Sequence, residues 1–472
     1  MVFLKKTEIN IFLTVWIVYI TFASGFGGNY MATSVLYGTM AFVDNGVFYT
    51  DDYIQEGCNE SGCDHAFYNG HFYSGYAPGG SFLALPLYVI FKPFLDFFIS
   101  DSLFDYSALR LKIITFNLLA IIFISSLLSA LLSVLLYKTL EYFSINKKNR
   151  LIITFIFAFA TLMFVYSSEY NIRTISVFFA FLAFYLLFSM KNEKRINKKY
   201  LFFAGLSSAF SIALTYTDAI IFVLLFLYLL TFLRDRRIVW FLFGASIILS
   251  GILLYHYVIF DDPLTTAYHH RASTDVPYTQ GTADLTYPNW YRIWNLSFSP
   301  FKGVFFYMPI LLLSFYGLFL NFRKNKFFIE NLFILSIFLA YFFYNASLSY
   351  SWHANCAFGP RYLIMIIPFF MLPLMFVIEK TNVFIFIFGI LSFFINYLGT
   401  IYMGYVTWVG GCVDSNQIFN YYIPILLNKG LSNYSLELIN KKITYLSNFL
   451  TNFISIFVLF FLGIIIYLIW KK

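Results

Sequence analysis

Residues 27–80 contain many of the side chains whose types could do chemistry. Carboxylates recur through this segment, and His65 and His71 lie among them. A carboxylate beside a hydroxyl can act as a general base, and with histidine it can bind a metal ion. Neither His-x-His nor His-x-x-x-His occurs here, so no residue is assigned to a metal; a divalent ion stays open as a cofactor, and a solvated acidic loop is the alternative. The candidate catalytic carboxylates are Asp44, Asp51, Asp52 and Asp64.

Basic side chains elsewhere could bind an anion. Arginine and protonated histidine hold phosphate oxygens through charge-assisted hydrogen bonds. The alternatives are an ordinary exposed loop for the histidine pair and an interfacial anchor for an arginine at a helix end. The candidates are His269, His270 and Arg271 in the segment 259–302, with Arg361 and Arg110 at the ends of apolar runs.

The composition determines which elements must position these groups. Of 472 residues, 60% are hydrophobic and 11% are charged, whereas a soluble protein carries roughly 25% charged residues. A soluble enzyme and a disordered chain are excluded. The net charge of +8 is dispersed in short clusters, so no nucleic-acid partner is implied. We predict a single polytopic transmembrane domain over residues 1–472, with membrane lipids as partners.

The apolar runs predict the crossings. A helix that spans a bilayer needs about 20 mainly apolar residues, and short loops rich in Lys and Arg stay cytoplasmic. The basic clusters fall on one side only if 81–99, which contains Pro86 and Pro93, does not cross. We therefore predict an all-α polytopic membrane protein with about 12 transmembrane helices, cytoplasmic termini, and 81–99 as an interfacial helix outside. The apolar runs are 11–26, 81–99, 108–137, 151–168, 174–190, 200–217, 219–233, 238–258, 303–321, 327–346, 361–378, 383–404 and 450–470.

This topology predicts where the chemistry takes place. The outer segments are 27–80, 259–302, 347–360 and 405–449, so the catalytic loops face the extracytoplasmic side of the cell membrane. All four cysteines fall in these segments, as expected for an oxidising compartment. Cys58–Cys63 and Cys356–Cys412 are candidate disulfides, with free thiols as the alternative.

Three segments together resemble one family. They are GHFYSGYAPGGSFLALPLY at 70–88, SPFKGVFFYMPILLL at 299–313 and FGPRYLIMIIPF at 358–369. In this order they resemble the polytopic GT-C membrane glycosyltransferases, in particular the dolichyl-phosphate-mannose-protein mannosyltransferase-like members. The resemblance implies a GT-C-like fold in which the first outer loop carries juxtamembrane helices and a catalytic acidic residue.

The resemblance also implies a function. The protein would transfer a sugar from a polyprenyl-phosphate donor to a glycan, lipid or protein acceptor, inverting the anomeric centre in a single displacement. Asp51 and Asp52 are then the first candidates for the general base, with Asp44 and Asp64 in reserve. The donor-binding residues implied by the matching segments are His71, Tyr73, Tyr76 and Lys302.

The chain departs from the family pattern in two places. An early Asp-Glu pair is replaced by Gly28-Asn29-Tyr30-Met31, and the usual basic residue before the proline is replaced by Tyr76-Ala77. Either Asp51 or Asp52 is the base and Arg361 or Arg110 binds phosphate, or the chemistry is altered. A transporter or lipid flippase is the main alternative, although charged residues cluster at span ends rather than near mid-membrane. A membrane protein without catalysis is a third.

Overall fold

Helices form nearly all of the chain that the structure describes, as expected for an all-α membrane protein. The computed structural model describes residues 5–24, 30–54, 64–99, 108–270, 285–324, 327–354, 356–408, 416–431 and 448–471. The chain divides into two units. Unit 1 comprises Met1–Gly28, Ser126–Glu169 and Tyr287–Lys472, and unit 2 comprises Asn29–Ser125 and Tyr170–Thr286.

Unit 1 holds the two ends of the chain and most of its C-terminal half. Its helices are α1 (Lys6–Thr21), α6 (Leu127–Leu140), α7 (Lys147–Phe159), α8 (Leu162–Ser167), α13 (Trp290–Ser297), α14 (Val304–Tyr307), α15 (Leu312–Lys324), α16 (Phe328–Ser347), α17 (Ile367–Met371), α18 (Leu374–Ile378), α19 (Asn382–Trp408), α20 (Ile423–Lys429) and α22 (Asn448–Lys471). Short turns of 3-10 or π helix complete it: η4 (Pro309–Leu311), η5 (Ser351–His353), η6 (Arg361–Ile366) and η8 (Ile418–Tyr422).

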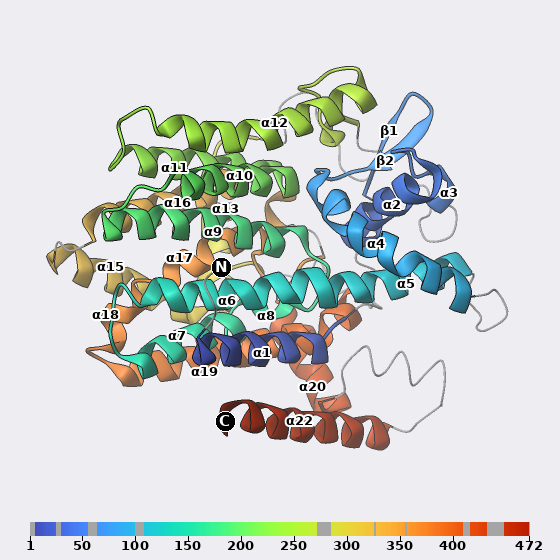
Figure 1. Cartoon of the computed structure of the whole chain (residues 1–472). Coiled ribbons are helices and arrows are strands. Elements are labelled where there is room, and N and C mark those ends of the chain that lie inside the picture. Colours follow the sequence, from blue (N-terminus) through green and yellow to red (C-terminus); the bar gives the residue numbers. More distant parts are fainter. Residues whose placement is uncertain are drawn as a thin grey trace. The chain divides into compact units, whose positions relative to one another are not determined.

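Unit 2 contains most of the segment 27–80, which is predicted to lie outside, and a group of long helices. Its elements are α2 (Tyr30–Asn45), α3 (Asp51–Ile54), β1 (His65–Tyr68), β2 (His71–Ser74), α4 (Gly79–Phe98), α5 (Ala108–Ala120), α9 (Ile172–Glu193), α10 (Lys198–Leu214), η2 (Tyr216–Asp218), α11 (Ala219–Leu230), α12 (Ile238–Phe260) and η3 (Ala267–His270), while η1 (Ile121–Ser126) ends at its border. Helices α9, α10, α11 and α12 pack side by side, and α4 runs obliquely to them (Figure 1).

Seven helices among the described residues are long and apolar enough to cross a membrane. They are Gly79–Phe98, Ala108–Leu140, Ile172–Glu193, Ile238–Phe260, Phe328–Ser347, Asn382–Gly404 and Ile454–Lys471. Three shorter apolar helices cover Tyr216–Leu230, Pro309–Arg323 and Arg361–Met371. The polytopic fold class is thus confirmed, while the number of twelve crossings stays a prediction. The interfacial position of α4 also stays a prediction, because α4 meets the same criteria of length and composition.

Several predicted spans are interrupted helices. The run 303–321 is divided into α14, η4 and α15 around Pro309, and the run 361–378 into η6, α17 and α18 around Pro368 and Pro373. Proline lacks the N–H that continues an α-helix and clashes with the preceding turn. The run 151–168 breaks between α7 and α8, where the Thr161 hydroxyl accepts a hydrogen bond from the Met163 N–H.

Two glycines allow α10 and α12 to pack closely. A Cβ on Gly205 would lie 1.9 Å from the Phe241 carbonyl oxygen, and one on Gly244 would lie 2.1 Å from the Phe202 carbonyl oxygen. Both distances are far below van der Waals contact, so each helix presents a glycine where the other's backbone approaches. Small residues have this role at helix crossings in membranes.

A β-hairpin in the first outer segment is the one sheet among the described residues. Its strands β1 and β2 are antiparallel, with Tyr68 opposite His71. The two turn residues both have positive φ, 49° at Asn69 and 85° at Gly70, which is the conformation that Asn-Gly favours in two-residue hairpins. The hairpin packs on the end of α12, where Ala66 and Tyr73 share a buried cluster with Ile259, Phe260 and Ala267.

Candidate active site

Asp51, the first residue of α3, faces His71, the first residue of β2. Oδ2 of Asp51 lies 2.6 Å from Nδ1 of His71, and the backbone N–H of Phe72 donates to Oδ1 of Asp51 at 2.7 Å. So short a contact between a carboxylate and a ring nitrogen is typical of a charge-assisted hydrogen bond. The structure therefore brings together a predicted catalytic residue and a predicted donor-binding residue.

Backbone pairing holds these two residues in place. Tyr49 forms an antiparallel bridge with Tyr73, and the N–H of Thr50 donates to the Phe72 carbonyl oxygen at 2.7 Å. The ring of Tyr49 also stacks on the imidazole of His71, with centroids 4.4 Å apart. The residues before α3 thus lie beside β2 like a short third strand, and they fix the direction of the imidazole.

The Asp51–His71 pair is open to solvent. Side-chain exposure is 33% for Asp51 and 45% for His71. Within the described residues, the imidazole of His71 forms its hydrogen bond through Nδ1. The carboxylate and the imidazole can therefore both be reached by solvent.

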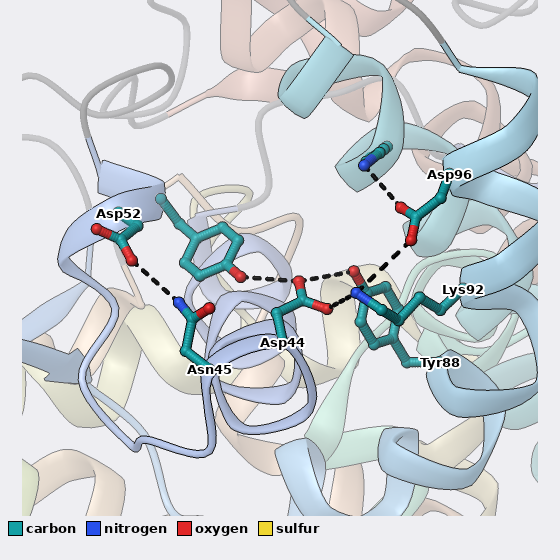
Figure 2. Close-up of polar contacts among 8 residues, drawn as sticks. Asp44, Asn45, Asp52, Tyr88, Lys92 and Asp96 are labelled. Carbon is teal, nitrogen blue, oxygen red and sulfur yellow. Dashed lines mark hydrogen bonds and ion pairs between the residues drawn. The ribbon is translucent and has the colours of Figure 1, made fainter.

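Asp44, a reserve candidate, lies in a much more crowded environment. Its Oδ2 accepts hydrogen bonds from the hydroxyls of Tyr53 at 2.8 Å and Tyr88 at 3.0 Å, and its Oδ1 forms an ion pair with Lys92 of α4 (Figure 2). Burial and the bond to this carboxylate raise the pKa of Tyr53, so the tyrosine remains a donor. Three donors leave Asp44 little capacity to accept a substrate proton.

The same ion-pair chain continues to α5. Asp96 lies 3.6 Å from Lys92, one helical turn away, and accepts a hydrogen bond from Lys112 at 2.7 Å. The chain of charges joins α2, α4 and α5 through Asp44, Lys92, Asp96 and Lys112 (Figure 2). Such a network suits a structural role, because each charge has an opposite charge beside it.

Asp52 and Asp64 are in contrasting positions. Asp52 is exposed, and its carboxylate accepts a hydrogen bond from the side chain of Asn45 at 3.0 Å. Asp64 accepts a hydrogen bond from the hydroxyl of buried Tyr76, and its carbonyl oxygen accepts one from Ser34 at 2.7 Å. Asp64 and Tyr76, both candidates, thus bind each other, whereas Asp52 binds Asn45.

His65 and Tyr73 belong to the interior of the hairpin. His65 is buried, and burial lowers its pKa to about 4. Its Nδ1 lies 3.2 Å from the Tyr73 carbonyl oxygen. Burial followed by the nearby Asp51 charge raises the pKa of Tyr73. Neither side chain changes its charge near neutral pH, so both position the hairpin.

The predicted histidine pair lies against the hairpin. The ring of His270 packs on Tyr68 and Phe260, with centroid distances of 4.6 and 5.0 Å, and burial lowers the pKa of His270. Nδ1 of His269 accepts a hydrogen bond from the Thr266 N–H at 3.2 Å. Tyr68 lies opposite His71 in the hairpin. The packing of His270 on Tyr68 therefore stabilises the hairpin. Arg271 lies outside the described residues.

Unit 1 contains a second group of candidates around Lys302. The Lys302 ammonium is fully buried and donates to the Ala357 carbonyl oxygen. This contact joins the segment 299–313 to the residue that directly precedes the segment 358–369; both segments carried the family resemblance. Gly359 supports the junction: its φ is 60°, and a Cβ there would lie 2.9 Å from the ring of Tyr307.

Lys302 lies within electrostatic range of two other basic side chains, Arg361 and His353. Burial first, and the positive charge of Arg361 second, lower the pKa of Lys302 to about 7. Burial and the charge of Lys302 lower the pKa of His353. Arg361 itself is partly buried at the start of η6. Lys302 and Arg361 in a poorly solvated environment suit an anionic ligand, because Coulomb attraction is strong at low dielectric constant.

The remaining candidates have less defined surroundings. Arg110 is exposed on the first turn of α5. Cys356 is disulfide-bonded, whereas Cys58, Cys63 and Cys412 lie outside the described residues. Within the described residues, no group of three or more His, Cys, Asp or Glu side chains could hold a metal ion.

Sequence reasoning missed several residues of these sites. The hairpin was overlooked, although Asn69-Gly70 between two short strands signals one. Lys92 was not among the candidates, and its partner on α2 could not be foreseen. His353 was not singled out at all, since nothing in the sequence indicates that its neighbour in space is Lys302.

The fold defines a class: a polytopic helical membrane protein. Unit 2 contains the paired side chains of Asp51 and His71, and unit 1 contains a basic group near the start of η6. The comparison with known families is consistent with this class. Residues 106–256 match the family described as dolichyl-phosphate-mannose-protein mannosyltransferase. The predicted resemblance is confirmed over these residues, where the chain is similar to that family.

The extent of the match limits what it says about residues. It covers about a third of the 472 residues and extends from the start of α5 into α12. The segments 70–88, 299–313 and 358–369 all lie outside it. No curated protein matches the chain. The roles of individual residues therefore rest on geometry and chemistry.

Proposed function

We propose that the protein transfers a sugar from a polyprenyl-phosphate donor to an acceptor hydroxyl at the extracytoplasmic face of the cell membrane. The observation that carries the proposal is the solvent-open Asp51, which has His71 at 2.6 Å. It is a first-loop carboxylate that an acceptor can reach, whereas Asp44 is already bound by three donors. The base function is therefore assigned to the Asp51–His71 pair, with exposed Asp52 as the alternative.

Within unit 1 taken by itself, the basic group has the charge to bind a phosphate. Lys302 and Arg361 supply positive charge, and His353 lies beside them. As the bond between the anomeric carbon and the phosphate oxygen breaks, negative charge grows on the phosphate, and fixed cations stabilise it. The apolar helices provide surroundings for the polyprenyl tail.

The reaction is a single displacement. The acceptor oxygen attacks the anomeric carbon, the acceptor proton passes to the base, and polyprenyl phosphate leaves. One displacement inverts the anomeric configuration. Positioned base catalysis contributes typically 10²–10⁴-fold to such a step.

Purified protein incubated with labelled polyprenyl-phosphate sugars and a panel of glycan, lipid and protein acceptors tests this function. We expect label to move to one acceptor class with inverted configuration, which NMR of the product detects. Uptake of label into vesicles without transfer would support the transporter alternative and contradict the proposal. Retention of label by the donor with every acceptor would also contradict it.

A further inference from the structure

We infer that Nε2 of His71 receives the acceptor proton, and that Asp51 is a positioning residue that acts through the imidazole. The inference rests on the proposed function and refines the role given there to Asp51. It follows from the way the Asp51 carboxylate and the His71 ring are held.

Both oxygens of Asp51 already have donors. Oδ1 accepts from the Phe72 N–H at 2.7 Å, and Oδ2 lies 2.6 Å from Nδ1 of His71. An ionised carboxylate only accepts hydrogen bonds, so Nδ1 of the neutral imidazole carries the proton. Nε2 then holds the free lone pair, and it can accept a proton from a substrate.

The ring is held and yet accessible. Tyr49 stacks on it at a centroid distance of 4.4 Å, which restricts its rotation. His71 follows the tight Asn69-Gly70 turn and pairs with Tyr68, so its backbone is fixed by the hairpin. With 45% of its side chain exposed, His71 is more accessible than Asp51. The hairpin thus exposes the imidazole to an acceptor more than it exposes the carboxylate.

The proton and the bonding electrons of the displacement each have a defined destination. The acceptor O–H bond breaks as its oxygen bonds to the anomeric carbon, and the proton goes to Nε2 of His71. The electron pair of the bond between the anomeric carbon and phosphate leaves with the phosphate. The negative charge of Asp51 stabilises the imidazolium that forms, and the imidazolium later releases the proton to water.

Replacement of the imidazole is the first test. In His71→Gln, we expect the transfer rate at saturating donor to fall by about 10²–10⁴-fold. Free imidazole added to His71→Gly should restore part of the rate, because a small base can occupy the space. A folding defect would not be reversed in this way. Absence of rescue in a folded His71→Gly protein, or near-full activity of His71→Gln, would overturn the inference.

Replacement of the carboxylate is the second test. In Asp51→Asn, the amide can donate to Nδ1 and hold the proton on Nε2, the wrong tautomer for a base. We expect a large loss of kcat with little change in the donor KM. The double variant should be no slower than His71→Gln, because the two residues act as one unit. Additive losses would contradict a role through His71.

A control variant completes the design. Asp235→Asn alters an exposed ion pair with Arg237. It is the control for the effect of an Asp→Asn substitution outside the candidate sites. An inactive wild type would overturn the proposed function itself, whereas an active His71→Gln would overturn only this inference and return the base role to Asp51 or Asp52.

Discussion

Asp44 of α2 and Lys92 of α4 form an ion pair that two tyrosine hydroxyls, from Tyr53 and Tyr88, complete on the carboxylate side. α4 therefore directs a cation toward α2, even though most of its sequence is apolar. The pair explains how a run that contains Lys92 and Asp96 forms a regular helix: its charges face partners on α2 and α5.

Removal of this cation should weaken the packing of α4 on α2. In Lys92→Met, Asp44 keeps its tyrosine donors and loses its counter-ion, so we expect unfolding to become easier by about 1–3 kcal/mol. Thermal unfolding in detergent measures the change. Lys112→Met is the control, since its partner Asp96 is 42% exposed and exposed pairs contribute about 0–1 kcal/mol. Equal midpoints for wild type and Lys92→Met would contradict the structural role.

A substitution of Asp44 tests whether this carboxylate stabilises the fold or takes part in catalysis. In Asp44→Asn, we expect a lower unfolding midpoint and a transfer rate per folded molecule within a few-fold of wild type. The amide keeps part of the hydrogen bonding, so the loss of stability should be about 1–2 kcal/mol. Loss of transfer at an unchanged midpoint would instead make Asp44 the catalytic carboxylate.

Hydropathy and basic clusters predicted the helical class because burial in lipid requires long apolar helices. The long helices α9, α12, α16 and α19 follow the predicted runs closely. The runs at 303–321 and 361–378 were predicted as single spans, and Pro309 and Pro368 mark where the structure interrupts them. These breaks could have been read from the sequence, because proline ends or kinks a helix.

The sequence predicted several residues of the sites, but not which of these residues contact each other. Asp51, His71, Lys302 and Arg361 were all candidates from their segments. That Asp51 meets His71 depends on a hairpin and a strand-like stretch at Tyr49, and that Lys302 meets the Ala357 carbonyl depends on contact between distant segments. Tertiary folding creates such contacts, and local sequence patterns carry no direct signal for them.

The crossing of α10 and α12 makes a prediction about stability. Gly205→Ala should raise the free energy of the folded state by about 1–3 kcal/mol, because its methyl group would overlap the Phe241 carbonyl and force the helices apart. Gly251→Ala on α12 is a matched control, since nothing lies within 4 Å of the added Cβ. Unfolding midpoints of the two variants in the same detergent measure the difference. The reverse order of midpoints would show that the helices do not cross at Gly205.

The basic group of unit 1 predicts a pH dependence of donor binding. Lys302 has a pKa of about 7, lowered from 10.5. It is therefore charged below about pH 7 and loses its charge as the pH rises through that value. A phosphodiester donor keeps its charge over this range, so the donor KM should increase from about pH 6 to about pH 9.

Lys302→Gln is the matching variant for this pH dependence. We expect a higher donor KM at low pH and a flatter pH profile, because no ammonium remains to titrate. Since Lys302 is fully buried, the unfolding midpoint of the variant should be recorded alongside. A folded Lys302→Gln protein with the wild-type pH profile would show that Lys302 does not bind the donor.

The central claim is that the acid–base residues of the first outer segment work on the extracytoplasmic side, and side-specific labelling tests it most directly. Phe67→Cys places a thiol on β1 at a position that is 47% exposed, and Asn149→Cys places one at the start of α7 between predicted cytoplasmic basic residues. An impermeant maleimide applied to intact cells should modify the Phe67→Cys variant, and the Asn149→Cys variant only after lysis. Labelling in the opposite order would place the hairpin in the cytoplasm and contradict the account.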